Sequence, residues 1–174
     1  MHVLTLLVLT AILSGCTTTA QNGPPYSALA QSMGPPKAGQ ARIIVFRGGS
    51  PALFNTPWDV TLDGTPLGGV GMGTFIYRDV PAGRHKLVLL FDPFPRPSTL
   101  EFDVAGGRTY AFRVEMGEKG KFMMATGAAA GIAGLLVVGA ISAASDERGS
   151  YDFVPVDPGA VAGINLAEAS KSGG

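Results

Sequence analysis

Apolar side chains recur at every second position through much of residues 41–116. Trp58, Val60 and Leu62 alternate with polar neighbours, which is the pattern of a strand that buries one face. Turn residues interrupt this alternation about every 8–12 residues, and Asp63-Gly64 is a strong hairpin signal. The spacing indicates six or seven short strands. We therefore expect a mainly β chain whose residues 41–116 form a small antiparallel β-sandwich or barrel.

Individual strands can be assigned from the same alternation. Ile43 to Phe46 is apolar at every position, as in a strand with two apolar faces. Pro66 places its strand at a sheet edge, because proline cannot donate a ladder hydrogen bond. In residues 149–174, Tyr151 to Val156 alternates like a last strand that rejoins a sheet edge. Ala160 to Ala169 is expected to form a short helix. Further strands are expected around Phe75, Leu87, Leu100 and Tyr110.

A short apolar run near the N-terminus ends in Leu13-Ser14-Gly15-Cys16, and Cys16 is the only cysteine among 174 residues. The residues that follow it are polar, so they offer no core in which a thiol could be buried. The segment resembles a bacterial lipobox. In lipoproteins of that kind the cysteine is acylated and becomes the first residue after cleavage. The resemblance implies that residues 1–15 are a lipoprotein signal peptide, too short to span a bilayer.

Lipidation of Cys16 implies attachment to a membrane, since each buried methylene contributes about 0.8 kcal/mol. Thr17 occupies the position at which enteric inner-membrane lipoproteins often have aspartate. By resemblance to that sorting rule, we expect the outer membrane, with the protein facing the periplasm. Residues 16–40 contain two Gly-Pro-Pro runs, which disfavour regular structure and predict a flexible tether. Within it, Tyr26 to Met33 is expected to form one or two helical turns.

The strand and turn motifs support a resemblance to known β-sandwich modules. Trp58 to Gly64 ends a strand in Asp-Gly, Val80 to His85 contains a Val-Pro-Ala-Gly turn, and Gly106 to Phe112 opens a further strand. This pattern resembles PEGA-type and carboxypeptidase-regulatory-like modules. It is also similar to an uncharacterised family of bacterial envelope lipoproteins that shares the lipobox, tether and glycine-rich tail. The resemblance covers Ala41 to Met116 and implies a fold, without catalytic residues.

Residues 117–148 include an uncharged stretch, Phe122 to Ser145, that is rich in glycine and alanine. Gly127, Gly131 and Gly134 would share one face of a helix, where small residues let another helix approach closely. Three alternatives are open: a membrane-crossing helix, a helix packed on the sandwich or on a second copy, and an irregular apolar loop. Helix packing through these glycines predicts a homo-oligomer or an envelope protein partner.

Phe94 and Arg96 are the candidate residues of a partner-binding loop. Prolines at positions 93, 95 and 97 prevent ladder pairing around them. Aromatic and arginine side chains are common anchors of protein interfaces. The alternative is a hairpin loop in which Phe94 folds back onto the core.

Composition and motifs do not favour enzymatic or cofactor chemistry. The chain has 13 Lys+Arg and 13 Asp+Glu, which offers no basic face for nucleic acid. His85 is the one histidine outside the signal peptide, too few for a His/Cys metal site, and we expect it to be a partly exposed strand residue. Gly68 to Gly73 lacks the Gly-Lys-Ser/Thr ending of a phosphate loop and is expected to be a flexible inter-strand loop.

These features together predict a non-catalytic lipoprotein of the cell envelope, held at a membrane by acyl chains on Cys16 and without a cofactor or metal. The β-sandwich would serve a structural or protein-interaction role in the periplasm. A module that binds a peptide, a glycan or a small molecule is the alternative.

Overall fold

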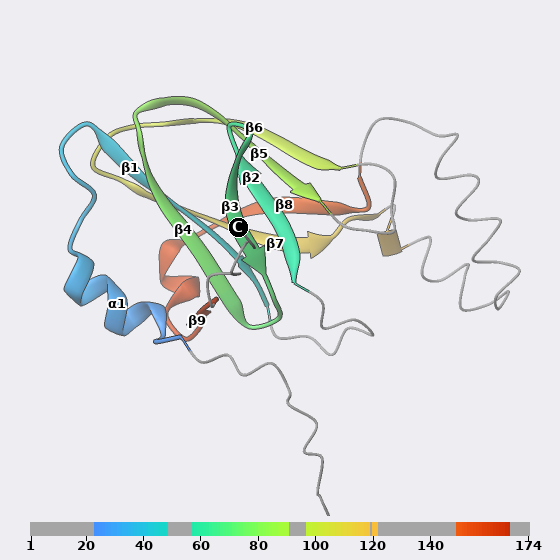
Figure 1. The fold of residues 1–174 in the computed structure, drawn as a ribbon, viewed down its shortest axis with the longest axis horizontal. Helices are drawn as coiled ribbons and strands as arrows, with labels where there is room; N and C mark the ends of the chain where they lie inside the picture. Colours follow the sequence, from blue (N-terminus) through green and yellow to red (C-terminus); the bar gives the residue numbers. More distant parts are fainter. Residues whose placement is uncertain (1–22, 49–56, 91–96, 119, 122–148, 168–174) are drawn as a thin grey trace, which may run out of the picture.

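The structure is a computed structural model that describes residues 23–48, 57–90, 97–118, 120–121 and 149–167. Strands dominate it (Figure 1). The elements in chain order are α1 (Tyr26–Met33), β1 (Gln40–Arg47), β2 (Trp58–Leu62), β3 (Thr65–Val70), β4 (Thr74–Pro81), β5 (Gly83–Leu90), β6 (Ser98–Val104), β7 (Thr109–Met116), β8 (Tyr151–Val156), η1 (Pro158–Val161) and β9 (Asn165–Leu166).

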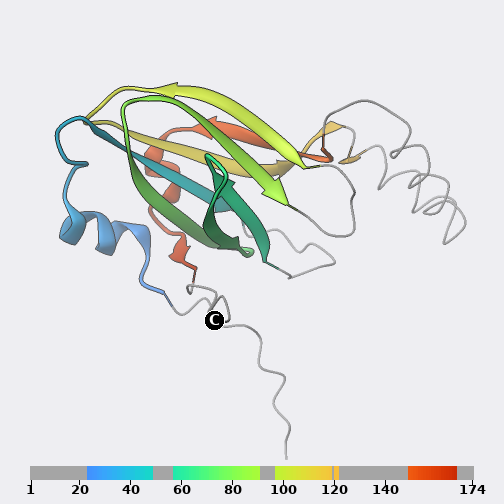
Figure 2. The same cartoon turned by 45° about the horizontal axis from the view of Figure 1, so that its top comes forward.

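The strands form two sheets that face each other as a β-sandwich (Figure 2). Sheet A has the order β8-β7-β1-β4-β9, and sheet B has the order β3-β2-β5-β6. The prediction of a mainly β fold with antiparallel-rich sheets is confirmed. Two pairs depart from it, because β1 lies parallel to β7 and β4 lies parallel to β9. The chain leaves sheet A after β1 and re-enters beside it as β7, so a crossover replaces the hairpin that antiparallel pairing would use.

The strand connections gather at the two ends of the sandwich. We call one the turn end, where tight turns at residues 63–64, 82 and 105–108 join the strands. We call the other the loop end. There, strands of both sheets begin or end at Arg47, Trp58, Leu90, Ser98, Met116 and Tyr151, and Gly71 to Gly73 joins β3 to β4. All the longer connections between strands leave from the loop end.

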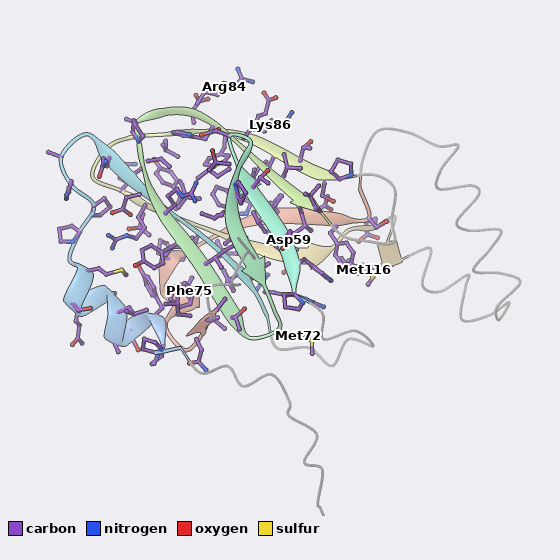
Figure 3. All side chains as sticks on the ribbon, viewed as in Figure 1. Asp59, Met72, Phe75, Arg84, Lys86 and Met116 are labelled. Carbon is purple, nitrogen blue, oxygen red and sulfur yellow. The ribbon has the colours of Figure 1, made fainter. Side chains whose placement is uncertain are left out.

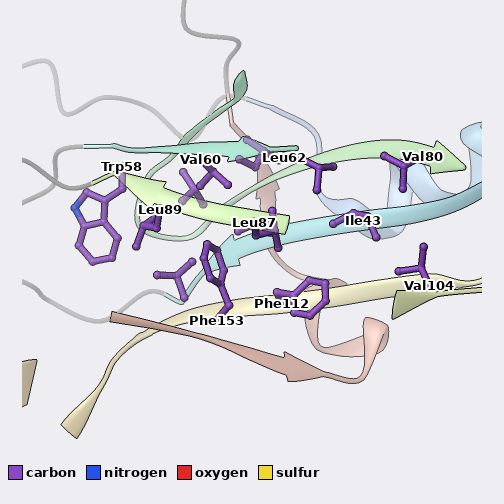
Figure 4. Packing of buried hydrophobic residues seen from close by; sticks show 14 of the residues in the cluster. Ile43, Trp58, Val60, Leu62, Val80, Leu87, Leu89, Val104, Phe112 and Phe153 are labelled. Atoms are coloured by element: carbon purple, nitrogen blue, oxygen red, sulfur yellow. The ribbon is translucent and has the colours of Figure 1, made fainter. Parts of the chain in front are cut away.

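The main core fills the space between the sheets and extends from one end to the other (Figure 4). Trp58, Val60 and Leu62 are buried while Asp59 is exposed, so the predicted alternation of this strand is confirmed. In Figure 4, Trp58 marks the loop end of the core, and Val80 and Val104 mark the turn end. Facing side chains of β1, β5, β7 and β8 complete this core, among them Ile43, Val45, Leu87, Leu89, Phe112, Val114 and Phe153.

A second apolar cluster lies on the outer face of sheet A. Ile44, Phe46 and Phe75 are its central side chains, and Tyr26 and Leu29 of α1 pack against them. Both faces of β1 are therefore buried, in agreement with its uninterrupted apolar sequence. The helical turns expected at Tyr26–Met33 are present as α1. This part of the expected tether is not free, because its apolar face covers sheet A.

Two local expectations are wrong. Residues 160–167 do not form a helix: η1 ends at Val161, and β9 pairs with β4 instead. The backbone N–H of Asn165 donates to the carbonyl oxygen of Gly73, so tertiary pairing outweighs local helix propensity. Likewise, residues 68–70 belong to β3, which leaves only Gly71 to Gly73 as a turn. β3 does lie at a sheet edge, as Pro66 predicted.

No helix among the described residues combines the length and the apolar character needed to cross a membrane. The glycine-rich stretch 122–145 lies outside that part of the chain, and so do Cys16, Phe94 and Arg96.

Candidate functional site

Side chains from three strand ends stack at the loop end. The guanidinium carbon of Arg47, the last residue of β1, lies 3.5 Å from the centroid of the Trp58 ring. The ring of Tyr151, which opens β8, lies 4.2 Å from Trp58. Burial lowers the pKa of Arg47 and raises that of Tyr151, and the mutual Coulomb interaction opposes both shifts. The stack therefore joins sheet A to sheet B through a cation–π contact shielded from water.

Ser98 and its neighbours close the loop end beside this stack. The Oγ atom of Ser98 accepts a hydrogen bond from the backbone N–H of Tyr151 at 3.3 Å. A Cβ atom on Gly149 would lie 2.1 Å from the same Oγ, so the chain passes there without room for a side chain. The backbone N–H of Gly117 donates to the carbonyl oxygen of Ser150 at 3.1 Å. Both flanks of the glycine-rich stretch are thus fixed together at the loop end.

The N-terminal part of the described chain joins the sandwich near the same end. Leu166 of β9 donates its backbone N–H to the carbonyl oxygen of Pro24 at 3.0 Å, and Asn165 donates to Gly73 at 3.2 Å. Gly73 in turn donates to the carbonyl oxygen of Arg47 at 2.9 Å. A short chain of backbone hydrogen bonds therefore connects the start of the described N-terminal segment to the end of β1.

The structure places none of the candidate residues predicted from the sequence, because Cys16, Phe94, Arg96 and the three glycines lie outside the described residues. It does place their flanks. Leu90 and Pro97, on either side of the proline-rich loop, are at the loop end, and Leu90 is a large hydrophobic side chain that is 48% exposed. Figure 3 shows Met72 and Met116 toward this end, whereas Arg84 and Lys86 project away from it.

At the turn end, a histidine and an aspartate form a clasp that sequence reasoning missed. The Nδ1 atom of His85 lies 2.7 Å from Oδ2 of Asp63, and its Nε2 atom lies 2.9 Å from the carbonyl oxygen of Pro81. Asp63 also accepts the backbone N–H of Lys86 at 2.9 Å. His85 is buried, so the expectation of a partly exposed residue is wrong, and the reason is that both ring nitrogens have partners.

The backbone of the hairpin turn positions Asp63 for this contact. Asp63 has φ 52° and Gly64 has φ 76°, the pair of positive values that a type I′ turn requires. The predicted Asp63-Gly64 hairpin is thus confirmed, and its aspartate also ties the turn to β5. Because the pair is held by backbone groups on both sides, it is suited to a structural role. Among the described residues, no three His, Cys, Asp or Glu side chains gather as a metal site would require.

The clasp should make stability depend on pH. Burial lowers the pKa of His85, but the hydrogen bonds to Asp63 and Pro81 and the charge of Asp63 raise it above its ordinary value. Burial raises the pKa of Asp63, but His85 and the Lys86 N–H bring it below its ordinary value. The pair therefore stabilises most between about pH 4 and 6.5. Its contribution falls above this window as His85 loses its proton, and below it as Asp63 gains one.

Asp63→Asn tests this dependence, because asparagine tolerates the positive φ but carries no charge. Wild-type stability should fall between pH 6 and 8.5. In the variant that fall should flatten or reverse, since burial then disfavours the protonated His85. Urea unfolding of both proteins at the two pH values measures the difference. Equal pH dependence in the two proteins would show that the clasp carries no linked charge.

Comparison of the sequence with protein-family models and with curated proteins gives no match. The resemblance to PEGA-type modules rests on the strand and turn motifs quoted above. The Arg47–Trp58–Tyr151 stack could not be found from those motifs, because it depends on which strand ends of the two sheets face each other.

Proposed function

We propose that the protein is a non-catalytic lipoprotein of the bacterial cell envelope, anchored through acyl chains on Cys16. The observation that carries this proposal is the Leu13-Ser14-Gly15-Cys16 motif, which contains the sole cysteine of the chain. The sandwich begins close behind it, since Gly23 is the first described residue. In this proposal the sandwich is presented in the periplasm, at the outer membrane, for a structural or protein-interaction role.

The outer face of sheet B supports exposure of the domain to water. Asp59, Lys86 and Asp103 are exposed there, and Arg84 pairs with Glu101 through Nη2 and Oε2 at 2.7 Å. Such a surface ion pair contributes little stability, about 0–1 kcal/mol, but it keeps the face polar. A polar face of this kind fits a domain held beside a membrane by a separate anchor.

The ligand-binding alternative would be favoured by exposed aromatic side chains gathered on a sheet face. Leu90 is the large hydrophobic side chain that stands exposed among the described residues, and its aliphatic chemistry does not suit glycan stacking. We therefore prefer a structural or interaction role. Assembly through Gly127, Gly131 and Gly134, or partner binding through Phe94 and Arg96, remains part of the proposal.

Cys16→Ala tests the anchor directly. In a bacterial host fed a palmitate analogue, the wild-type protein should take up the label and sediment with membranes. The alanine variant should lose all labelling and keep residues 1–15, because neither acylation nor cleavage can proceed without the thiol. Mass spectrometry of the purified N-terminus and fractionation of the cells provide the readouts. A wild-type protein that retains Met1 and a reactive thiol would refute the anchor.

A further inference from the structure

We propose that the loop end of the sandwich faces the bilayer, so that a lipid surface is its docking partner. This orientation rests on the Cys16 anchor proposed above, and it adds which face of the domain meets the membrane. The argument uses where the chain joins the fold, how much chain separates that point from Cys16, and which side chains lie at each end.

The point at which the chain joins the fold is fixed near the loop end. Pro24 is hydrogen-bonded to Leu166, which pairs with Phe75, the second residue of β4. A Cβ atom on Gly23 would lie 2.1 Å from the carbonyl oxygen of Leu166, so Gly23 is in close contact with β9. The turn end of β4, at Pro81, is six residues beyond Phe75, or about 20 Å along the strand.

The length of chain before Gly23 then favours one orientation. Cys16 precedes Gly23 by seven residues, which span at most about 25 Å when fully extended. A flexible segment of this length has a typical end-to-end distance of about 15 Å. With the turn end against the bilayer, Gly23 would stand about 20 Å from the surface and the segment would be nearly taut. With the loop end against it, the segment can remain relaxed.

The side chains at the two ends agree with this choice. Exposed charged residues surround the turn end, namely Lys37, Asp63, Arg84, Asp103 and Arg108. At the loop end, Leu90 is an exposed apolar side chain. Two charged residues there, Glu118 and Lys121, form an ion pair between Oε1 and Nζ at 2.6 Å. Leu90 could therefore enter the headgroup region, whereas the turn end would bring unpaired charges to it.

The uncharged stretch 122–145 has both flanks at the same end. Gly117 and Ser150 are joined by a backbone hydrogen bond, so the chain leaves and returns at one place. In the proposed orientation this place lies next to the bilayer, where an apolar sequence has favourable surroundings.

A matched pair of labels measures the orientation. Leu90 and Arg84 lie on the same face of β5, six residues and about 20 Å apart, and both are exposed. Cys16 becomes a thioether on lipidation, so Leu90→Cys and Arg84→Cys would each present one reactive thiol. Each full-length lipidated variant is labelled with a donor dye and reconstituted into phosphatidylethanolamine–phosphatidylglycerol vesicles that carry acceptor dye on their headgroups. Energy transfer should be about twofold or more higher from position 90, as its height is about 20 Å lower.

Vesicle flotation separates the two proposals. If neither labelled protein floats with the vesicles, the lipid anchor itself is refuted. If both float but transfer from position 84 equals or exceeds that from position 90, the anchor stands and the orientation is overturned. Insertion of about 20 Gly/Ser residues between Asn22 and Gly23 should reduce the contrast while flotation persists. A contrast that survives this insertion would show that chain length does not set the orientation.

Discussion

Phe75→Ala is expected to destabilise the protein by about 3–5 kcal/mol and to release α1 from sheet A. Phe75 is completely buried, at 0% exposure, in the cluster on the outer face of that sheet. Its ring meets the Tyr26 ring edge to face, with centroids 5.5 Å apart. Alanine would leave a cavity beneath α1 and remove the aromatic contact that holds the first turn of the helix. Both losses act on the same joint.

Phe153→Ala is the matched control for this variant. Phe153 lies in the main core between the sheets, away from the cluster under α1. Urea unfolding should show a large loss of stability for both variants. Limited proteolysis under native conditions should cut within α1 only in Phe75→Ala. Equal protection of α1 in the two variants would mean that Phe75 does not secure the helix.

Release of α1 would also change the relation to the bilayer. With α1 docked, the segment after Cys16 ends at Gly23, but with α1 free it would extend to Gly39, about 23 residues with a typical span of about 27 Å. That span exceeds the distance between the two ends of β4. The contrast between labels at Leu90 and Arg84 should then shrink. The packing of one helix on sheet A therefore determines how firmly the anchor orients the domain.

The strands could be predicted from the sequence because burial of one face imposes a two-residue period. Trp58, Val60 and Leu62 give that period directly, and Asp63-Gly64 supplies the turn that ends it. The alternation reports which face a side chain occupies. It does not report which strand lies next to it. The parallel pairing of β1 with β7 was therefore beyond reach, since it depends on the path of five intervening strands.

Contacts between segments distant in sequence were missed for the same reason. The Gly-Pro-Pro runs correctly disfavour long helices near α1, but they contain no information about the apolar cluster that α1 covers. β9 is two residues long, too short for any periodic signal. The His85–Asp63 contact requires β2 and β5 to be neighbours, and this was not known from the motifs. In each case a tertiary contact decided what local sequence left open.

Asp79→Ala is expected to destabilise the protein by about 3 kcal/mol or more, because it leaves a buried cation without its partner. Arg42 is 5% exposed and donates from Nε and Nη2 to the two carboxylate oxygens of Asp79, at 2.7 and 2.9 Å. The hydrogen bond to Asp79 raises the pKa of Arg42, against the effect of burial. Arg42 therefore keeps its charge when Asp79 is removed, and the whole cost of burying that charge falls on the folded state.

The double variant Arg42→Met with Asp79→Leu separates the energy of the pair from its positional role. Replacing both charges by apolar groups should restore most of the stability lost in Asp79→Ala, as measured by urea unfolding. Arg42 also donates from Nη1 to the carbonyl oxygen of Gly34, which follows the last turn of α1, at 2.8 Å. The double variant lacks this bond, so proteolysis should still reveal a loosened end of α1. Recovery of stability together with full protection of α1 would show that the ion pair does not position the helix. A loosened helix on a stable sandwich would show that Arg42 acts mainly to hold α1, and with it Gly23, in place.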